Sequence, residues 1–408
     1  MYRNYSWYKA TEPKTYESEI YDNGLKFERP SISVDPQSWE PLAIDRMSKD
    51  ATGYIYGSAG TRETTDKNDK SYKKWSIIPR RLVKSGFPNL STKVFGMDYS
   101  FPIALAPIGV QMIFNPEGER GSSRAATLEH VPYIISTASS LSFEEIAKSS
   151  GPGERWYQLY WPSNENNDIT ASLLKRAKDT GCKVLVVTLD TYILGWRPSD
   201  MDNGYDPFLK PDQVGVALGF SDPVFRKRFK EEHGVEVEQD LHKAAREFSS
   251  IIFPGISHDW EDLKFLREHW DGPIVLKGIM SVPDAKKAAE HGMQGIIVSN
   301  HGGRQQDGGV ASLTMLPKIV DAVGDKLEIL FDSGIRCGAD IVKALALGAK
   351  MVLIGRPYAY GLAIAGTKGV SHVIRCLLGD LELTLHLSGV PSVSPKDLNR
   401  DLLLLEDN

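Results

Sequence analysis

The sequence contains little of what marks metal-binding or disulfide-linked proteins. Its three cysteines, Cys182, Cys337 and Cys376, are scattered over 408 residues, and no two of them stand at a spacing typical of metal ligands. Such sparse use of cysteine is typical of a reducing compartment. We therefore expect a cytoplasmic protein that holds no metal ion.

An excess of one charge and a long apolar run are also missing. The formal net charge at pH 7 is -5, which is mild and argues against a nucleic acid or a membrane surface as a partner. No run of about 18 apolar residues is present, so we expect no membrane-spanning helix. The first residues, Met1–Tyr5, are polar and aromatic and lack the apolar core of a signal peptide.

The third absence concerns dinucleotide-binding motifs. No Gly-x-Gly-x-x-Gly stretch follows an early strand, which makes an open, doubly wound sheet the weaker of two α/β alternatives. From about residue 100, short apolar runs instead alternate with amphipathic stretches. This alternation predicts an α/β fold, a closed (β/α)8 TIM barrel. The eight predicted strands are Ile103–Ala106, Tyr133–Ser136, Trp156–Tyr160, Val184–Leu189, Ile274–Leu276, Ile296–Val298, Ile329–Phe331 and Val352–Ile354.

The rest of the chain is predicted to surround this barrel, which spans residues 100–394. Residues 1–99 form an N-terminal arm with a helical segment at 41–55, and residues 395–408 form a C-terminal tail. The charged stretch 61–74 is expected to be a solvated surface segment. The connection 191–273, which follows the fourth strand, is far longer than its counterparts and is placed to act as a lid.

Ser299–Asp307 is the most informative stretch for function. It follows a predicted buried strand, and ligands bind at the C-terminal ends of parallel strands. His301 stands between Asn300 and two glycines, where nothing apolar is available to pack on it. A histidine is useful as a base because its pKa is near neutrality. We therefore interpret His301 as a catalytic base and Arg304 as a fixed cation beside it.

Other strand ends carry charged residues whose roles the sequence leaves open. Asp190 and Arg197 follow the fourth strand and could form a structural ion pair. Alternatively, Asp190 orients an imidazole and Arg197 binds a carboxylate. Lys277 ends a buried strand, so its charge must serve an anion, unless it is an uncharged amine of an isomerase or aldolase.

The remaining strand ends suit a flat ring and a phosphate. Pro107-Ile108-Gly109 lets the backbone approach a ring closely, although a plain turn is the alternative. Small residues and arginines follow the last two strands, where this fold binds phosphate. The predicted ligands are a phosphorylated planar cofactor and a small carboxylic acid. Further polar groups at strand ends are Ser136, Gln158, Tyr160 and Thr188.

Together these residues resemble the FMN-dependent α-hydroxy acid oxidases and dehydrogenases. The likeness runs from about Asp35 to about Ser394 and, within the family, is greatest to lactate 2-monooxygenase. It is carried by Ala106-Pro107, Gln158-Leu159-Tyr160, Thr188-Leu189-Asp190-Thr191, Leu276-Lys277-Gly278, Ser299–Gln305, Asp332-Ser333-Gly334-Ile335-Arg336 and Ile354-Gly355-Arg356-Pro357. The monooxygenase likeness rests on the segments Ile20–Leu25, Gly195–Pro198, Ser221–Arg226 and Arg356–Leu362.

The resemblance implies FMN as cofactor and a small, lactate-like L-2-hydroxy acid and O2 as substrates. It implies decarboxylated acid, CO2 and water as products, or alternatively a 2-oxo acid and hydrogen peroxide. A homo-oligomer, either a tetramer or an octamer, is also implied. A catalytically silent FMN-binding barrel is the alternative from another class. Asn300 is the residue found in oxidases rather than monooxygenases, and Ala138 leaves room beside the substrate where plant glycolate oxidases have tryptophan.

The resemblance also implies a role for each site residue. His301 is the base, Asp190 orients it, and Lys277 stabilises the reduced flavin. The substrate is bound by Arg197 and Arg304 together with Tyr54 and Tyr160. The residues implied to bind FMN are Pro107, Ile108, Gly109, Ser136, Gln158, Thr188, Lys277, Ser299, Asp332, Ser333, Gly334, Arg336, Gly355 and Arg356.

Overall fold

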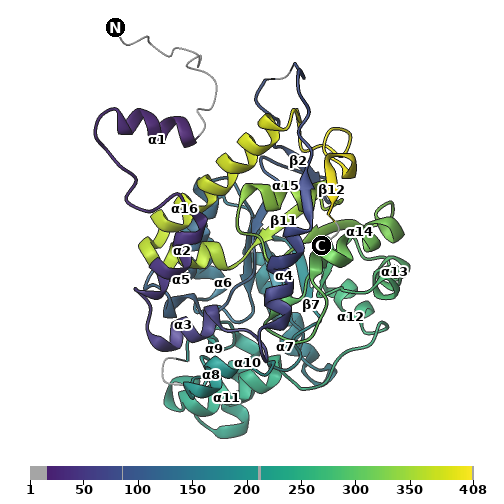
Figure 1. Cartoon of the computed structure of the whole chain (residues 1–408). Helices are drawn as coiled ribbons and strands as arrows, with labels where there is room; N and C mark the ends of the chain where they lie inside the picture. Colours follow the sequence, from purple (N-terminus) through teal and green to yellow (C-terminus); the bar gives the residue numbers. More distant parts are fainter. Residues whose placement is uncertain (1–15, 85, 210–212, 407–408) are drawn as a thin grey trace.

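A closed barrel of eight parallel strands forms the body of the protein in the computed structural model (Figure 1). The structure describes residues 16–84, 86–209 and 213–406. Every predicted strand is present within two residues of its expected ends. The barrel strands are β4 (Ile103–Leu105), β5 (Tyr133–Ser136), β6 (Arg155–Tyr160), β7 (Cys182–Thr188), β8 (Ile274–Lys277), β9 (Gly295–Val298), β10 (Glu328–Phe331) and β11 (Met351–Ile354).

Helices cover the outside of the barrel because the apolar face of each must be buried against the strands. The strands read as continuous apolar runs because both of their faces are buried, one by the helices and one by the barrel interior. The covering helices are α5 (Gly118–Leu128), α6 (Phe143–Ser150), α7 (Asn167–Asp179), α12 (Leu263–His269), α13 (Val282–Glu290), α14 (Ser312–Val323), α15 (Gly338–Ala346) and α16 (Arg356–Leu387). Within the described ranges, no helix combines the length and the apolar character needed to cross a membrane.

The segment before the barrel is largely helical rather than extended. It contains α1 (Tyr16–Gly24), α2 (Pro36–Ile44), α3 (Lys49–Tyr56) and α4 (Glu63–Lys73), followed by short strands β1 (Trp75–Ile77), β2 (Thr92–Val94) and β3 (Met97–Tyr99). The first 15 residues of the expected arm lie outside the described residues. The chain closes with β12 (Leu403–Leu405), which pairs antiparallel with β1 and thereby joins the tail to the segment before the barrel.

The expectation of a solvated surface segment at 61–74 holds for only one face of this stretch. This stretch forms helix α4, and one of its faces is buried against the barrel mouth. That face is polar, because threonine and asparagine side chains there bond to loops of the barrel rather than to water. Thr65 Oγ1 donates to Gly302 O at 3.2 Å, and Asn68 Nδ2 donates to Asn300 Oδ1 at 2.8 Å. The polar residues of this stretch therefore include some that contact the barrel.

The long connection after β7 folds into a small unit of its own. Its helices are α8 (Pro198–Asp202), α9 (Ala217–Phe220), α10 (Pro223–His233) and α11 (Leu241–Ile252), and they bury Phe225, Phe229 and Phe248 between them. The unit is fixed to the barrel helix α7 through Asp222, which is fully buried. Asp222 accepts a hydrogen bond from Ser172 Oγ at 2.7 Å and lies 3.4 Å from Arg176 Nη1.

We expect Asp222→Ala to destabilise the protein by about 3 kcal/mol in thermal or urea unfolding. The substitution removes the N-cap of α10, which bonds to Val224 N and Phe225 N, and takes a buried carboxylate from Arg176. Asp168→Ala is the matched control, because it breaks the exposed pair with Arg228 at 3.1 Å and should cost less than about 1 kcal/mol. Equal losses for the two variants would show that Asp222 is not the anchor.

Candidate active site

Lys277 stands at the centre of the barrel mouth, where β7, β8, β9 and β10 end. The parallel register places Thr188 of β7 opposite Lys277 of β8, so that Asp190, two residues further on, lies beside the lysine. Lys277 Nζ is 4.0 Å from Asp190 Oδ2 and 3.6 Å from Asp332 Oδ2, and it donates to Ser299 Oγ at 3.1 Å. The lysine is buried, and its side-chain nitrogen lies between two carboxylates.

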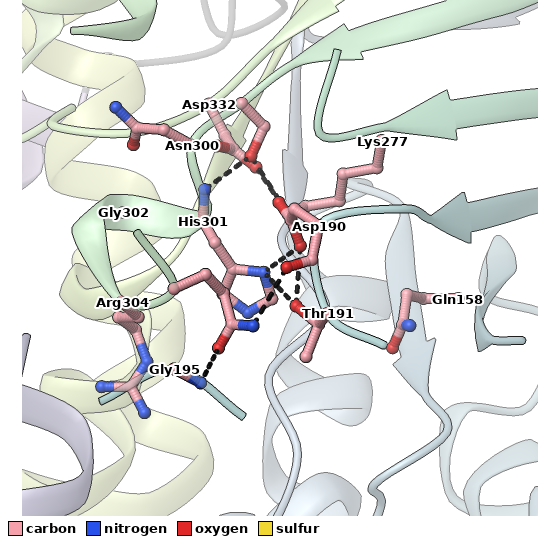
Figure 2. A network of polar contacts seen from close by, with 12 residues as sticks. Gln158, Asp190, Thr191, Gly195, Lys277, Asn300, His301, Gly302, Arg304 and Asp332 are labelled. Carbon is pink, nitrogen blue, oxygen red and sulfur yellow. Dashed lines mark hydrogen bonds and ion pairs between the residues drawn. The ribbon is translucent and has the colours of Figure 1, made fainter. Parts of the chain in front are cut away.

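His301 and Asp190 form a hydrogen-bonded pair beside this lysine (Figure 2). His301 Nδ1 lies 2.8 Å from Asp190 Oδ1, and Thr191 Oγ1 donates to the same oxygen at 2.7 Å. Because an ionised carboxylate only accepts hydrogen bonds, Nδ1 carries the hydrogen and Nε2 keeps a free electron pair. The backbone aims the ring through left-handed turns, with φ of 59° at His301 and 65° at Gly302.

The charges of this pair are set by burial and by one another. Burial alone would raise the pKa of Asp190, but His301 and Lys277 hold that pKa below its ordinary value. Burial lowers the pKa of His301; the Asp190 charge opposes this shift, and Lys277 adds to it. At neutral pH the pair is therefore an Asp190 carboxylate and a neutral imidazole, which is the state that can accept a proton at Nε2.

Two guanidinium groups at the mouth have no carboxylate partner among the described residues. Arg197 is 6% exposed and donates from Nε to Arg304 O at 3.1 Å. Arg304 donates to the backbone oxygens of Tyr54 and Gly57, and its guanidinium lies 4.8 Å from the centre of the Tyr54 ring. Its Nη2 atom is buried and has no hydrogen-bond partner in the part of the chain that the structure describes. Such a pair is suited to hold an anion, because buried charge is costly unless it is compensated.

The other side of the cavity is built from small residues and arginines. Arg356 is half-buried and donates to Ile55 O, Gly57 O and Gly302 O, and burial lowers the pKa of its guanidinium to about 10. Arg356 has five N–H donors, so donors remain after these three bonds. Gly355 also lines this cavity, and a Cβ atom there would meet nothing within 4 Å, so the cavity is open beside it. This side can receive an anionic group with several oxygens.

Two buried polar atoms at strand ends also lack partners among the described residues. They are Gln158 Nε2 and Thr188 Oγ1, and both are groups that a heterocycle can satisfy through its edge. Ser136 Oγ donates to Gln158 Oε1 at 3.1 Å and thereby fixes the amide so that its nitrogen is left free. With the anion-binding side, these atoms fit a phosphorylated flat ring such as FMN.

The structure corrects the reason given for Gly109. The glycine was expected to leave space for a ring, but a Cβ atom at Gly109 would lie 2.5 Å from Ala138 O and 2.7 Å from Ala138 Cβ. The missing side chain therefore permits close packing of two loops. The cavity wall is formed by the segment that contains Gly109, together with Pro107 and Ile108.

Most of the predicted site residues lie around one cavity. Those that line it are Tyr54, Pro107, Ile108, Gly109, Tyr160, Lys277, His301, Arg304, Asp332, Ser333, Gly334, Arg336, Gly355 and Arg356. Asp190 lies behind His301, and Arg197 lines an adjoining cavity together with Tyr54 and Phe208 of the long connection. The remaining four, Ser136, Gln158, Thr188 and Ser299, are buried at strand ends.

Sequence reasoning missed three polar residues of the site. Thr191 bonds to Asp190, Asn68 pairs with Asn300, and the Gln305 side chain bonds to both Asp190 O and Arg197. Gln305 belongs to the stretch that was singled out, and Thr191 follows Asp190 directly, so position pointed to both. Asn68 had no such signal, because it comes from a helix before the barrel.

Comparisons with known proteins agree with this geometry. The model of the FMN-dependent dehydrogenase family matches residues 43–404. The chain is 77% identical over 407 residues to an FMN-dependent alpha-hydroxy acid dehydrogenase of Schizosaccharomyces pombe, covering 100% of both chains. It is 37% identical over 356 residues to an L-lactate oxidase of Lysinibacillus sphaericus, covering 87% of this chain and 89% of the relative.

A solved structure of mandelate oxidase is also similar, with a TM-score of 0.76 and 36% sequence identity over 89% of this chain and 96% of that chain. The barrel, its mouth and these likenesses define a flavin-dependent oxidoreductase whose cofactor is FMN. The chain belongs to the FMN-dependent α-hydroxy acid oxidase and dehydrogenase family.

We expect Gly303→Ala to lower the thermal midpoint and weaken FMN binding more than Gly308→Ala does. Both glycines have positive φ, 74° and 67°, so both variants bear a left-handed strain of about 1 kcal/mol. At Gly303, however, a Cβ atom would lie 2.7 Å from Thr65 N of α4, which adds about 1–3 kcal/mol of overpacking. At Gly308 the nearest atom is 3.8 Å away. Equal midpoints would contradict a tight contact between α4 and the His301 loop.

Proposed function

We propose that this enzyme oxidises a small L-2-hydroxy acid with O2 as the final electron acceptor. One arrangement supports the proposal most: the free Nε2 of His301 lies in the same mouth as two guanidinium groups that have no carboxylate partner in the described part of the chain. A proton acceptor beside a carboxylate-binding pair is what the oxidation of a 2-hydroxy acid requires.

Arg197 and Arg304 bind the substrate carboxylate in this proposal. Tyr54 and Tyr160 lie beside them, and burial raises the pKa of Tyr160, so its hydroxyl stays protonated and can donate a hydrogen bond. Fixing the carboxylate at two points orients the hydroxyl-bearing carbon toward His301. A neutral molecule of the same shape cannot make these charge-assisted bonds.

His301 acts as the base that takes a proton from the bound 2-hydroxy acid. The resulting imidazolium is stabilised by Asp190, which accepts from its Nδ1 and stays ionised because its pKa is held low. FMN, when bound, would supply the acceptor for the two electrons and the second hydrogen that the substrate loses, and O2 would reoxidise it. Lys277 supplies a fixed positive charge on the cofactor side of the mouth, which its two carboxylate neighbours hold in place.

The residues proposed to hold FMN fall into two groups. Pro107, Ile108, Gly109, Ser136, Gln158, Thr188 and Ser299 hold the ring, and Lys277 stands close to it. The ribityl chain and phosphate are held by Asp332, Ser333, Gly334, Arg336, Gly355 and Arg356. The free donors of Gln158, Thr188 and Arg356 support this division.

The fate of the first product separates two outcomes of the same chemistry. In a lactate 2-monooxygenase-like reaction, the site retains both the 2-oxo acid and hydrogen peroxide, and the peroxide oxidises the 2-oxo acid to the decarboxylated acid, CO2 and water. In an oxidase, the 2-oxo acid and hydrogen peroxide leave. Four sequence segments favour the monooxygenase, one of which, Gly195–Pro198, lies at the entrance. Asn300 favours the oxidase. The lactate 2-monooxygenase-like outcome stays our prediction, and product analysis tests it.

We expect L-lactate, tested without oxygen alongside other 2-hydroxy acids, to bleach the yellow colour of the FMN-loaded enzyme. After air is admitted, acetate and CO2 without free peroxide would identify the monooxygenase outcome, and pyruvate with peroxide would identify the oxidase outcome. If no acid of the panel bleaches the flavin, the proposed function is wrong and the catalytically silent barrel is favoured.

His301→Gln should keep FMN bound but slow anaerobic flavin reduction by about 1,000-fold or more, because glutamine cannot accept the proton. The wild-type reduction rate should rise with pH through a pKa below the ordinary 6.5 and then stay flat, since burial lowers the pKa of His301. The rate of His301→Gln should not follow that curve. Reduction of the variant at nearly the wild-type rate would assign the base to another residue.

A further inference from the structure

Arg197 is held in place by an amide rather than by a carboxylate. Its Nη2 donates to Gln305 Oε1 at 2.6 Å, and its Nε donates to the backbone oxygen of Arg304. Neither acceptor carries a full charge. Most buried arginines in proteins are neutralised by an acidic side chain, so this environment leaves the positive charge of Arg197 available.

Gln305 uses all of its hydrogen-bonding capacity at this position. Its Nε2 donates to Asp190 O at 3.0 Å and to Ile193 O at 2.9 Å, while its Oε1 accepts from Gly195 N at 3.2 Å and from Arg197 Nη2. An amide has two donors and one oxygen that accepts twice, so no capacity is left over. A glutamate of the same shape would present a carboxylate oxygen to the carbonyl groups of Asp190 and Ile193.

The backbone at Gln305 packs tightly against Gly195, near the start of the long connection. A Cβ atom at Gly195 would lie 2.4 Å from Gln305 O and 2.9 Å from Arg304 O, so only glycine permits this approach. Figure 2 shows Gly195 beside the loop that carries His301 and Arg304. The amide of Gln305 therefore fixes the segment from Asp190 to Arg197 on one side of the mouth.

No carboxylate forms an ion pair with Arg197 among the described residues. Burial lowers the pKa of Arg197 to about 10, and the neighbouring Arg304 charge adds to this shift. Asp200 acts in the opposite sense but forms no ion pair with Arg197 among the described residues, and burial raises the pKa of that carboxyl. Two guanidinium groups thus share a small space where repulsion is tolerated because neutral acceptors hold them.

We infer that Gln305 is a positioning residue that determines specificity for carboxylate substrates, because its neutral amide orients Arg197 without neutralising it. The inference rests on the function proposed above, in which Arg197 and Arg304 bind the substrate carboxylate. Gln305 itself touches neither substrate nor cofactor in this scheme. It acts through Arg197, whose full charge is left for the anion.

Three variants of the FMN-loaded enzyme separate charge from mechanical support. Gln305→Glu places a negative charge on Arg197 and keeps the shape of the side chain. Gln305→Ala removes all four hydrogen bonds but adds no charge. Gln306→Glu adds the same charge one residue further on, where the side chain is exposed, and serves as the matched control. The probe is oxalate, an unreactive dicarboxylate whose binding is followed through the change that it causes in the flavin absorption spectrum.

We expect Gln305→Glu to weaken oxalate binding by about 100-fold and Gln305→Ala by about 10-fold or less, with Gln306→Glu within about twofold of wild type. With L-lactate, Gln305→Glu should raise KM about as much while kcat changes by no more than about threefold. This order of the two variants distinguishes charge from support. If only mechanical support mattered, Gln305→Ala, which loses every side-chain hydrogen bond, would bind oxalate more weakly than Gln305→Glu.

Weaker oxalate binding by Gln305→Ala than by Gln305→Glu would overturn the inference, as would a wild-type enzyme that does not bind oxalate. If Gln305→Glu fails to fold, a loss of oxalate affinity of up to about 10-fold in Gln305→Ala supports the positioning role, whereas an unchanged affinity or a larger loss contradicts it. If the expected order holds but no 2-hydroxy acid reduces the flavin, the proposed function fails while the role of Gln305 in anion binding stands.

Discussion

The positive charge buried at the barrel mouth exceeds the negative charge that the described residues place there. Lys277 lies between the carboxylates of Asp190 and Asp332, whereas Arg197, Arg304 and Arg356 bond to carbonyl or amide oxygens. Buried charge is tolerated only when it is compensated. In the proposed function the substrate carboxylate and the cofactor phosphate restore this balance, so binding is driven by an imbalance built into the fold.

The barrel makes this arrangement possible because each of these charged side chains lies at the end of a different strand. The parallel register brings Asp190, Lys277 and Asp332 together, although they are far apart along the chain. The rigid ladder beneath them cannot relax to separate the charges, so their geometry is set before any ligand binds. The loops that follow the strands supply further groups of the site, such as His301.

Predictions from the sequence were most accurate where a local pattern alone determines the structure. Apolar, β-branched runs such as Ile296–Val298 predicted the strands, and polar residues at the strand ends predicted most of the cavity lining. Such predictions failed where the outcome depended on a distant partner. The charged sequence of α4 gave no sign that Asn68 pairs with Asn300, and Gly109 is small because Ala138 is close, which no local pattern reveals.

The long connection after β7 is attached to the rest of the chain through several contacts. They include Gly195 against the backbone of Gln305, Asp222 against Arg176 of α7, and Arg228 against Asp168 of the same helix. Its helices α9, α10 and α11 also pack on one another. Mutation and recombination can therefore remodel this unit, and with it the shape offered to the substrate side chain, while the groups that perform the chemistry stay in register. Divergence in substrate range within such a family needs no change in the catalytic core.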